Sequence, residues 1–194
     1  PGAVEANRRL LKRCLPAEPR WLDQVHGTTI VDAETVTDPV PADASITRNP
    51  GCVSVVLIAD CLPILFAERT GNTVAAAHAG WRGLAGGVVE NTVRAFDVPP
   101  RDLRAYLGPA IGPSAFEVGN DVRDIFMAAD QAAGLAFRPH KPGKWLADLF
   151  MLARQRLARS GVLSVYGGGY CTYSNPARFF SHRRDKVSGR MAAL

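Results

Sequence analysis

Three residues of the chain could hold a divalent metal together: His26, Cys61 and His78. Each ends a short apolar segment and is followed within two residues by Gly or Pro, as is typical of the end of a β-strand. One Cys and two His without an evident fourth protein ligand are typical of an open, catalytic zinc centre rather than a closed structural one. We therefore expect the chemistry of this protein at a metal that these three side chains bind.

Other roles are open for the same residues. Taken singly, His26 could be a turn histidine that binds a backbone carbonyl, Cys61 a small buried apolar residue and His78 a core histidine with a satisfied hydrogen bond. A second catalytic possibility needs no metal: Cys61 would be a thiolate nucleophile activated by His78, in a thiol hydrolase or deamidase. The combination of Cys61 with two histidines favours the metal, and the shared position at strand ends favours a functional role.

An anion site is expected beside the metal. A helix over residues 83–96 would begin directly after the strand that carries His78, and the preceding Gly80-Trp81-Arg82-Gly83 would aim backbone amides and one guanidinium towards the strand end. Helix N-termini and arginine side chains both bind phosphate or carboxylate. Arg82 could instead pair with Asp or Glu, but the nearby glycines leave it uncrowded, which favours anion binding. For His182, in the polar segment 181–184, substrate contact and simple solvation are both open.

The elements that must position these residues follow from apolar periodicity and turn signals. β-branched and apolar runs predict strands at residues 28–31, 53–59, 64–66, 73–74, 105–107, 162–166 and 178–184, with a hairpin turn at Gly71-Asn72. Helical spacing predicts helices over residues 4–15, 83–96, 118–129 and 145–160. Because several strands are neighbours along the chain, the fold class expected is mixed α/β rather than a regular doubly wound sheet.

The composition is that of an ordinary globular protein, with 194 residues, 47% of them hydrophobic and 21% charged. We expect one domain over residues 1–194. The longest apolar run, residues 55–59, is far shorter than the roughly twenty residues of a membrane-spanning helix.

The net charge of +5 favours anionic ligands, but no stacking aromatics lie among the scattered basic residues, so no specific nucleic-acid partner is expected. The four cysteines form no CxxC pair, which favours a reducing compartment such as the cytoplasm.

Six motifs together resemble the bacterial YfiH family, also called the multicopper polyphenol oxidase or laccase-domain family. They are Gln24-Val25-His26-Gly27, Ala42-Asp43-Ala44-Ser45-Ile46-Thr47, Ala59-Asp60-Cys61-Leu62-Pro63, His78-Ala79-Gly80-Trp81-Arg82-Gly83, Leu107-Gly108-Pro109-Ala110-Ile111-Gly112, and residues 179–184 with Gly189-Arg190-Met191. They run over nearly the whole chain, and their combination is specific although no single motif is. Members generally begin with a further segment that carries a Thr-Arg-x-Gly-Gly-like stretch, so we expect this chain to lack its N-terminal segment.

The resemblance implies a fold, a metal and a reaction. The fold is a layered sandwich of mixed β-sheets flanked by helices, similar to that of the cytotoxic necrotizing toxins. The metal is zinc, bound by the residues matching His26, Cys61 and His78. The reactions are phosphorolysis of the purine nucleosides inosine, guanosine, adenosine and methylthioadenosine, and deamination of adenosine. We further hypothesise that one pocket serves both reactions. In this hypothesis Arg82 holds phosphate, and Asp43, Thr47 and Asp60 are orienting or substrate-contacting groups.

Copper oxidation, which the family name suggests, fits the sequence poorly. A blue-copper site alone takes two His and one Cys, and a laccase adds a three-copper cluster bound mainly by further histidines. The chain has four histidines in total, which is too few for such a set. Zinc is therefore the expected cofactor, and a copper-dependent oxidase activity is disfavoured. A non-catalytic binding module is a third possibility, which predicts no turnover of any nucleoside.

Overall fold

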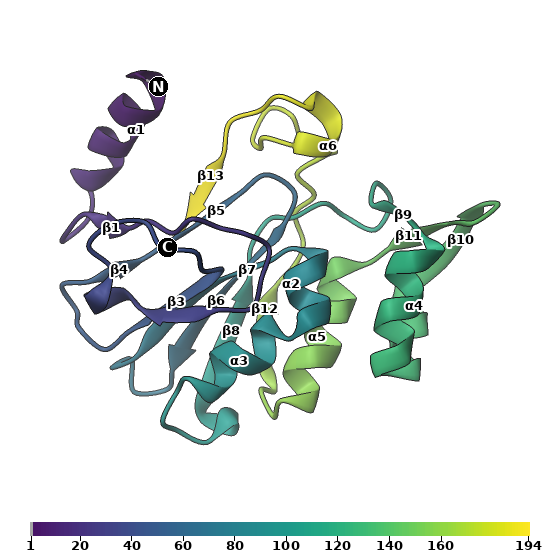
Figure 1. The fold of residues 1–194 in the computed structure, drawn as a ribbon, viewed down its shortest axis with the longest axis horizontal. Coiled ribbons are helices and arrows are strands. Elements are labelled where there is room, and N and C mark those ends of the chain that lie inside the picture. The colour runs from purple at the N-terminus through teal and green to yellow at the C-terminus, as the bar shows by residue number, and fades with distance from the viewer. Residues whose placement is uncertain (1) are drawn as a thin grey trace.

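The computed structural model describes residues 2–194, and its centre is a six-stranded mixed sheet (Figure 1). The strand order is β12-β8-β6-β7-β3-β2, formed by Ser164–Gly167, Leu103–Leu107, Leu62–Glu68, Val74–Ala79, Ala44–Thr47 and Ile30–Asp32. The inner strands are antiparallel to one another, whereas the edge strands β12 and β2 run parallel to β8 and β3. The hairpin expected at Gly71-Asn72 joins β6 to β7, with Gly71 at a φ of 81°. This sheet and the helices on it confirm the mixed α/β class.

One face of the sheet is covered by three helices that lie side by side in Figure 1, namely α2 (Trp81–Gly86), α3 (Val88–Arg94) and α5 (Leu149–Arg159). The strands alternate accordingly, and in β8 the side chains of Arg104 and Tyr106 are exposed while the three others are buried. The buried side chains of strands and helices form one large apolar core. Each large apolar side chain buried there contributes roughly 1.5–3 kcal/mol, which holds the helices on the sheet.

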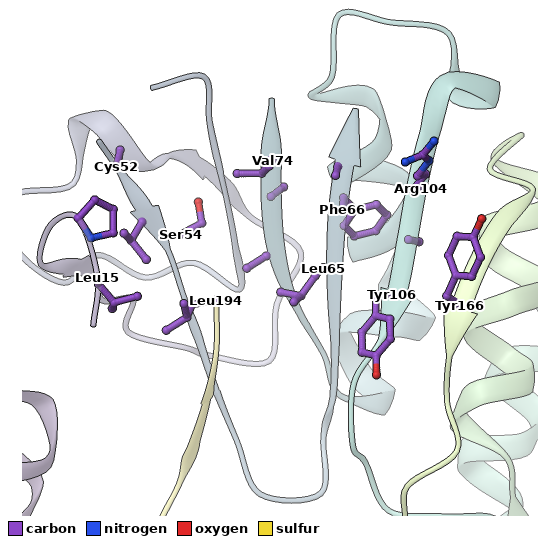
Figure 2. A pocket seen from close by; sticks show the side chains of 16 residues that line it. Leu15, Cys52, Ser54, Leu65, Phe66, Val74, Arg104, Tyr106, Tyr166 and Leu194 are labelled. Atoms are coloured by element: carbon purple, nitrogen blue, oxygen red, sulfur yellow. The ribbon is translucent and has the colours of Figure 1, made fainter. Parts of the chain in front are cut away.

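The other face of the sheet carries an open apolar groove of about 420 Å³ (Figure 2). Leu65, Tyr106 and Tyr166 project into it from neighbouring strands, and Leu15 and Leu194 lie on its far side. Two short strand pairs complete this part of the fold: β1 (Pro19–Arg20) is parallel to β4 (Val53–Ser54), and β13 (Met191–Ala193) is antiparallel to β5 (Val56–Ile58). The three metal-binding candidates do not line this groove.

A second, antiparallel sheet lies beside the helices, with α4 (Asn120–Ala129) packed against it (Figure 1). Its order is β10-β11-β9, formed by Phe137–Lys141, Lys144–Ala147 and Glu117–Gly119. The remaining helices are α1 (Gly2–Lys12), which buries no side chain, α6 (His182–Asp185) and the 3-10 turns Ala33–Thr35, Pro100–Asp102 and Gln131–Ala136. Within residues 2–194, no helix combines the length and the apolar character needed to cross a membrane.

Two predicted helices differ from the structure. The helix expected over residues 83–96 is interrupted at Gly87, whose φ of 105° ends α2 and begins α3, because glycine adopts this conformation without steric cost. The helix expected over residues 145–160 begins only at Leu149. Residues 144–147 pair with two strands as β11, and the Asp148 side chain caps α5 by accepting a hydrogen bond from the Met151 amide.

The strand expected over residues 178–184 is wrong, since this segment forms a loop and the first turn of α6. Side chains satisfy its backbone in place of a neighbouring strand. The Arg184 guanidinium donates to the Phe179 carbonyl at 3.0 Å, Ser181 Oγ accepts the Arg184 amide at 3.2 Å, and the Asp60 carboxylate accepts the Arg183 amide at 2.6 Å. Such local hydrogen bonds compete with a strand ladder, so the alternating polar pattern did not produce a strand.

Candidate metal centre

His26, Cys61 and His78 converge at one end of the central sheet. His78 is the fifth residue of β7, Cys61 directly precedes β6, and His26 lies in the loop between β1 and β2. Because Pro63 of β6 pairs with His78, the start of β6 and the end of β7 lie side by side. One ligand atom from each of the three residues lies within 4.8 Å of the other two, and Cys61 Sγ is 3.7 Å from His26 Nε2. The structure thus brings together the three residues that the sequence analysis selects.

Asp43 fixes both histidines by hydrogen bonds, to the ring of His78 and to the backbone amide of His26. Its fully buried carboxylate accepts a hydrogen bond from His78 Nδ1 at 2.7 Å. The same carboxylate accepts the backbone amides of Val25, His26 and Gly27 at 3.3, 3.0 and 2.6 Å. Burial alone would raise the pKa of Asp43, but these hydrogen bonds, that from His78 foremost, lower the pKa below its ordinary value. Asp43 therefore stays ionised, and His78 keeps Nε2 for a further ligand.

The backbone of His26 has a φ of 60°, in the left-handed region that residues other than glycine rarely adopt. Such a conformation costs about 1–3 kcal/mol and persists where the surroundings hold it. Asp43 does so by binding the His26 amide and the amides on either side of it. The result is that the exposed His26 ring faces His78, with 4.8 Å between the ring centroids.

Two glycines let neighbouring segments approach the site closely. A Cβ atom at Gly80 would lie 2.9 Å from Cys61 Sγ and 3.2 Å from His26 Cδ2. A Cβ atom at Gly83 would lie 2.8 Å from the carbonyl oxygen of Gly27. Only a residue without a Cβ atom fits at either position, so the Gly80-Trp81-Arg82-Gly83 motif serves the packing of α2 against the site.

The thiol of Cys61 and the ring of His78 shift each other's pKa. Burial alone would raise the pKa of Cys61, but hydrogen bonds and charge from His26 and His78 lower it to about 7. Burial alone would lower the pKa of His78, but Asp43 and Cys61 raise it to about 9. The group is therefore suited to hold a thiolate beside a protonated imidazole, and the thiolate is the form of cysteine that binds metals and attacks electrophiles.

The donor set fits a zinc ion. One thiolate and two imidazoles are ligands that zinc prefers, and at tetrahedral angles such donors lie roughly 3.4–3.6 Å apart. The 3.7 Å between Cys61 Sγ and His26 Nε2 is close to this spacing, and a carboxylate behind a ligating histidine is the usual supporting partner. Across residues 2–194 this is the one group of three or more His, Cys, Asp or Glu side chains with converging ligand atoms. These three residues could hold a metal ion, with a position left for water or substrate.

The candidate metal centre lies in the wall of a cavity of about 370 Å³, a size typical of small-molecule sites. The cavity is lined by Leu22, Gln24, His26, Leu57, Ala59, Cys61, His78, His182 and Arg190. The side-chain amide of Gln24 is fixed, since it accepts the Leu57 backbone N–H at 2.7 Å and donates to the Leu57 carbonyl at 2.8 Å. Arg190 lines the cavity but was not expected at the site. The one feature of the sequence that points to it is the motif Gly189-Arg190-Met191.

Asp60 positions the segment that carries His182 rather than the metal ligands. Its buried carboxylate accepts hydrogen bonds from Thr172 Oγ1 at 2.6 Å, Ser181 Oγ at 3.0 Å and the Arg183 amide at 2.6 Å. Because Ser181 and Arg183 flank His182, this carboxylate fixes the backbone on both sides of that histidine. Asp60, the residue before Cys61, thus joins this part of the chain to the C-terminal segment. Its expected role in orienting substrate stays a prediction.

Two residues expected at the site lie away from the cavity wall. Thr47 pairs with Val74, four residues along β7 from His78 and therefore on the order of 13 Å away, and its hydroxyl contacts Glu34 and Asn49. The Arg82 guanidinium stacks over the Trp81 ring, 4.4 Å from its centroid, and Arg82 is not among the residues that line the cavity. Both residues were expected at the site because they belong to motifs that also contain site residues. The length of the strand separates Thr47 from His78, and the Arg82 side chain is directed over Trp81.

Relatives match this chain in sequence over its whole length, and solved structures share its fold over nearly all of it. The chain is 54% identical to a Pseudomonas aeruginosa protein named purine nucleoside phosphorylase and 52% identical to the purine nucleoside phosphorylase YfiH of Escherichia coli, covering 100% of this chain and 80% and 81% of theirs. A crystal structure of a Neisseria meningitidis protein matches with a TM-score of 0.95 at 50% identity, covering 99% of this chain and 80% of that one. YlmD from Geobacillus stearothermophilus matches with a TM-score of 0.90 at 34% identity, covering 96% and 77%.

The resemblance seen in the sequence motifs extends to the family profile. The profile described as multi-copper polyphenol oxidoreductase laccase matches residues 1–194, and relatives named purine nucleoside phosphorylase, YfiH among them, match the same span. The chain belongs to the multi-copper polyphenol oxidoreductase laccase family, which is also the family of YfiH.

Proposed function

We propose that this protein is a zinc-dependent purine nucleoside phosphorylase acting on inosine, guanosine, adenosine and methylthioadenosine. In the reaction a phosphate oxygen bonds to C1 of the ribose while the bond from C1 to the purine nitrogen breaks, and the electron pair leaves on the purine, which takes up a proton. The observation that carries the proposal is the convergence of His26, Cys61 and His78 in the wall of a 370 Å³ cavity. Two relatives that are 54% and 52% identical to this chain support the proposal, because both are named purine nucleoside phosphorylase.

In this proposal the residues of the cavity and those behind its wall have different roles. A zinc ion held by His26, Cys61 and His78 would supply Lewis acidity. The apolar side chains of Leu22 and Leu57 offer a surface for the purine ring, and Gln24 keeps Leu57 in place. Asp43 keeps the histidine ligands oriented, so the site needs little rearrangement when substrate binds.

Adenosine deamination is proposed as a second activity of the same cavity. Its support is that the donor set leaves a position beside the three ligands for water or substrate, as catalytic zinc sites do. Deamination consumes water in place of phosphate and releases ammonia from C6, so the two reactions are separated by their need for phosphate.

The Cys–His hydrolase is the rival that one observation favours. Asp43, His78 and Cys61 form a chain of interacting side chains like that of cysteine hydrolases, with the pKa of Cys61 lowered to about 7. That mechanism has no use for His26, yet His26 Nε2 lies 3.7 Å from Cys61 Sγ and its loop is held in a strained conformation. We therefore favour the metal.

A multicopper oxidase is less well supported by these residues. Beyond the two histidines of the candidate centre, His140 lies on β10 with its Nε2 3.4 Å from a carboxylate oxygen of Glu117. His182 lines the same cavity as His26 and His78, but among residues 2–194 it is not part of the group whose ligand atoms converge. A three-copper cluster needs several histidines gathered together. Zinc is accordingly the metal that we propose.

The deciding experiment is product analysis by chromatography. The full-length, zinc-loaded protein is incubated with inosine or adenosine, with and without phosphate, beside a Cys61→Ser variant. Hypoxanthine or adenine that forms only with phosphate, and not with the variant, supports the phosphorylase, and inosine formed from adenosine without phosphate adds the deaminase. Absence of all products from the wild-type protein refutes both activities and favours the hydrolase.

A further inference from the structure

We infer that Arg190, assisted by His182, forms the phosphate-binding subsite of the cavity. This inference rests on the proposed phosphorolysis, because it assigns the anionic co-substrate of that reaction to a place in the same cavity. It replaces Arg82, the arginine that sequence reasoning assigns to phosphate.

The pairing of β13 with β5 places Arg190 beside the metal-binding residues. Met191 pairs with Ile58 in the antiparallel register, so Arg190 lies opposite Ala59, two residues before Cys61. Arg190 and Ala59 both line the cavity that contains the three candidate ligands. A C-terminal residue is thereby brought to the centre by strand pairing alone.

The guanidinium of Arg190 has donors to spare. Nη1 donates to the Ser188 carbonyl, Ser188 Oγ and the Gly189 carbonyl at 3.0, 3.2 and 3.1 Å. Nε and Nη2 make no hydrogen bond to any protein atom among residues 2–194. The local contacts hold the exposed side chain at the cavity, and the two free N–H groups on one edge of the guanidinium have the geometry that binds phosphate oxygens in pairs.

The nearby arginines are occupied elsewhere. Arg183 donates to the Glu117 carbonyl at 2.9 Å and stacks over Phe116. Arg184 donates to three backbone carbonyls and to the Asp185 carboxylate. Neither residue lines the cavity, so within the C-terminal segment Arg190 is the arginine placed to meet a ligand.

His182 adds a second donor on the same wall. It is the first residue of α6, and the Asp60 carboxylate binds the Ser181 hydroxyl and the Arg183 amide on either side of it. Its ring makes no hydrogen bond to protein atoms within residues 2–194, and it lines the cavity together with Arg190. The lining contains no Asp or Glu, so no wall carboxylate would repel a phosphate.

The experiment compares Arg190→Gln, Arg190→Lys and His182→Gln with the wild-type enzyme in its zinc-loaded, full-length form. Loss of a charge-assisted pair of hydrogen bonds in Arg190→Gln is expected to raise the KM for phosphate about 10- to 100-fold and to leave the KM for inosine within about twofold. His182→Gln should raise the KM for phosphate about 2- to 10-fold, and Arg190→Lys should fall between wild type and Arg190→Gln. Unchanged melting temperature and zinc content establish that the variants are folded.

Two further arginine variants serve as comparisons. Arg138→Gln removes the same charge from the exposed strand β10 and is expected to leave both KM values unchanged. Arg82→Gln tests the arginine expected from the sequence, and it too should leave the KM for phosphate unchanged. A phosphate KM that rises with Arg82→Gln and not with Arg190→Gln overturns the inference.

Calorimetric titration of inorganic phosphate into the zinc-loaded protein separates this inference from the proposed function. Heat of binding that Arg190→Gln abolishes supports the subsite even if no nucleoside is cleaved, in which case the phosphorylase proposal alone fails. If the wild-type enzyme cleaves inosine with phosphate but Arg190→Gln binds phosphate and turns over like the wild type, the phosphorylase stands and the subsite is wrong.

Discussion

Asp43 and His78 lie 35 residues apart in the chain, yet Asp43 Oδ1 is 2.7 Å from His78 Nδ1 and both side chains are buried. Because the same carboxylate also accepts the amides of the His26 loop, one side chain sets the positions of two candidate metal ligands. The centre therefore depends on a residue that would not itself touch the metal.

The first prediction follows from this relationship. Asp43→Asn keeps the shape of the side chain but weakens every one of its hydrogen bonds, so zinc affinity should fall about 10- to 100-fold. Competition with a chromophoric chelator measures the change. Asp124→Asn, at an exposed position on α4, is the matched control and should bind zinc like the wild type. Equal zinc affinity in Asp43→Asn and wild type would contradict the supporting role of Asp43.

Gly80→Ala should damage the centre by crowding. The added Cβ atom would meet Cys61 Sγ at 2.9 Å, so the thiol or the backbone must shift, and we expect reduced zinc occupancy with nucleoside cleavage lowered at least about tenfold. Zinc content by atomic spectroscopy and the cleavage rate give the answer. Gly169→Ala is the control, since a Cβ atom there meets nothing within 4 Å. A fully loaded, fully active Gly80→Ala enzyme would show that the close approach has no functional role.

Alkylation of Cys61 tests the electrostatics of the metal-free protein. The pKa of the thiol is lowered to about 7, and the thiolate is the reactive form, so the rate with iodoacetamide should fall as the pH drops through about 7 and level off above it. Mass spectrometry of the Cys61 peptide measures the rate separately from the other three cysteines. His26→Ala removes one cause of the lowered pKa and should move the midpoint upward.

The same reaction distinguishes the two mechanisms. Bound zinc should protect Cys61 from iodoacetamide, and removal of zinc by a chelator should stop nucleoside cleavage. A thiol hydrolase behaves in the opposite way, because alkylation abolishes its activity and chelation has no effect. Activity that survives complete removal of zinc would reject the metal proposal.

Asp60→Asn should weaken the attachment of the C-terminal segment to the chain beside the metal centre. The substitution weakens charge-assisted hydrogen bonds from Thr172, Ser181 and Arg183, and the free energy of unfolding should fall by about 2–4 kcal/mol. Denaturant titration measures this loss. Since the Asp60 carboxylate binds Thr172, Ser181 and Arg183 rather than the three candidate ligands, zinc affinity should change less than in Asp43→Asn, while the KM for phosphate rises. Thr172→Val, which removes one of the three donors, should give a smaller loss of stability.

The sequence by itself determined the class of the fold and the candidate metal ligands. Both depend on local chemistry. Gly71 and Asn72 form the hairpin turn, and the β-branched runs on either side form strands. His26, Cys61 and His78 could be selected because metal affinity belongs to the side-chain type and because turn residues mark the ends of strands. Cys61 and His78 meet because β6 and β7 are neighbours, whereas His26 lies in a loop that the Asp43 carboxylate holds beside them.

Only the tertiary structure decided which charged residues face the cavity. Arg82 stands next to the His78 motif in the sequence, but its guanidinium lies over Trp81, whereas Arg190 is 112 residues beyond His78 in the sequence and reaches the cavity through the pairing of β13 with β5. The roles of Asp43 and Asp60 likewise come from hydrogen bonds to segments distant in the chain. Sequence periodicity reports which face of an element is buried, but the register of long-range strand pairs and the direction of a side chain are set when the whole core packs.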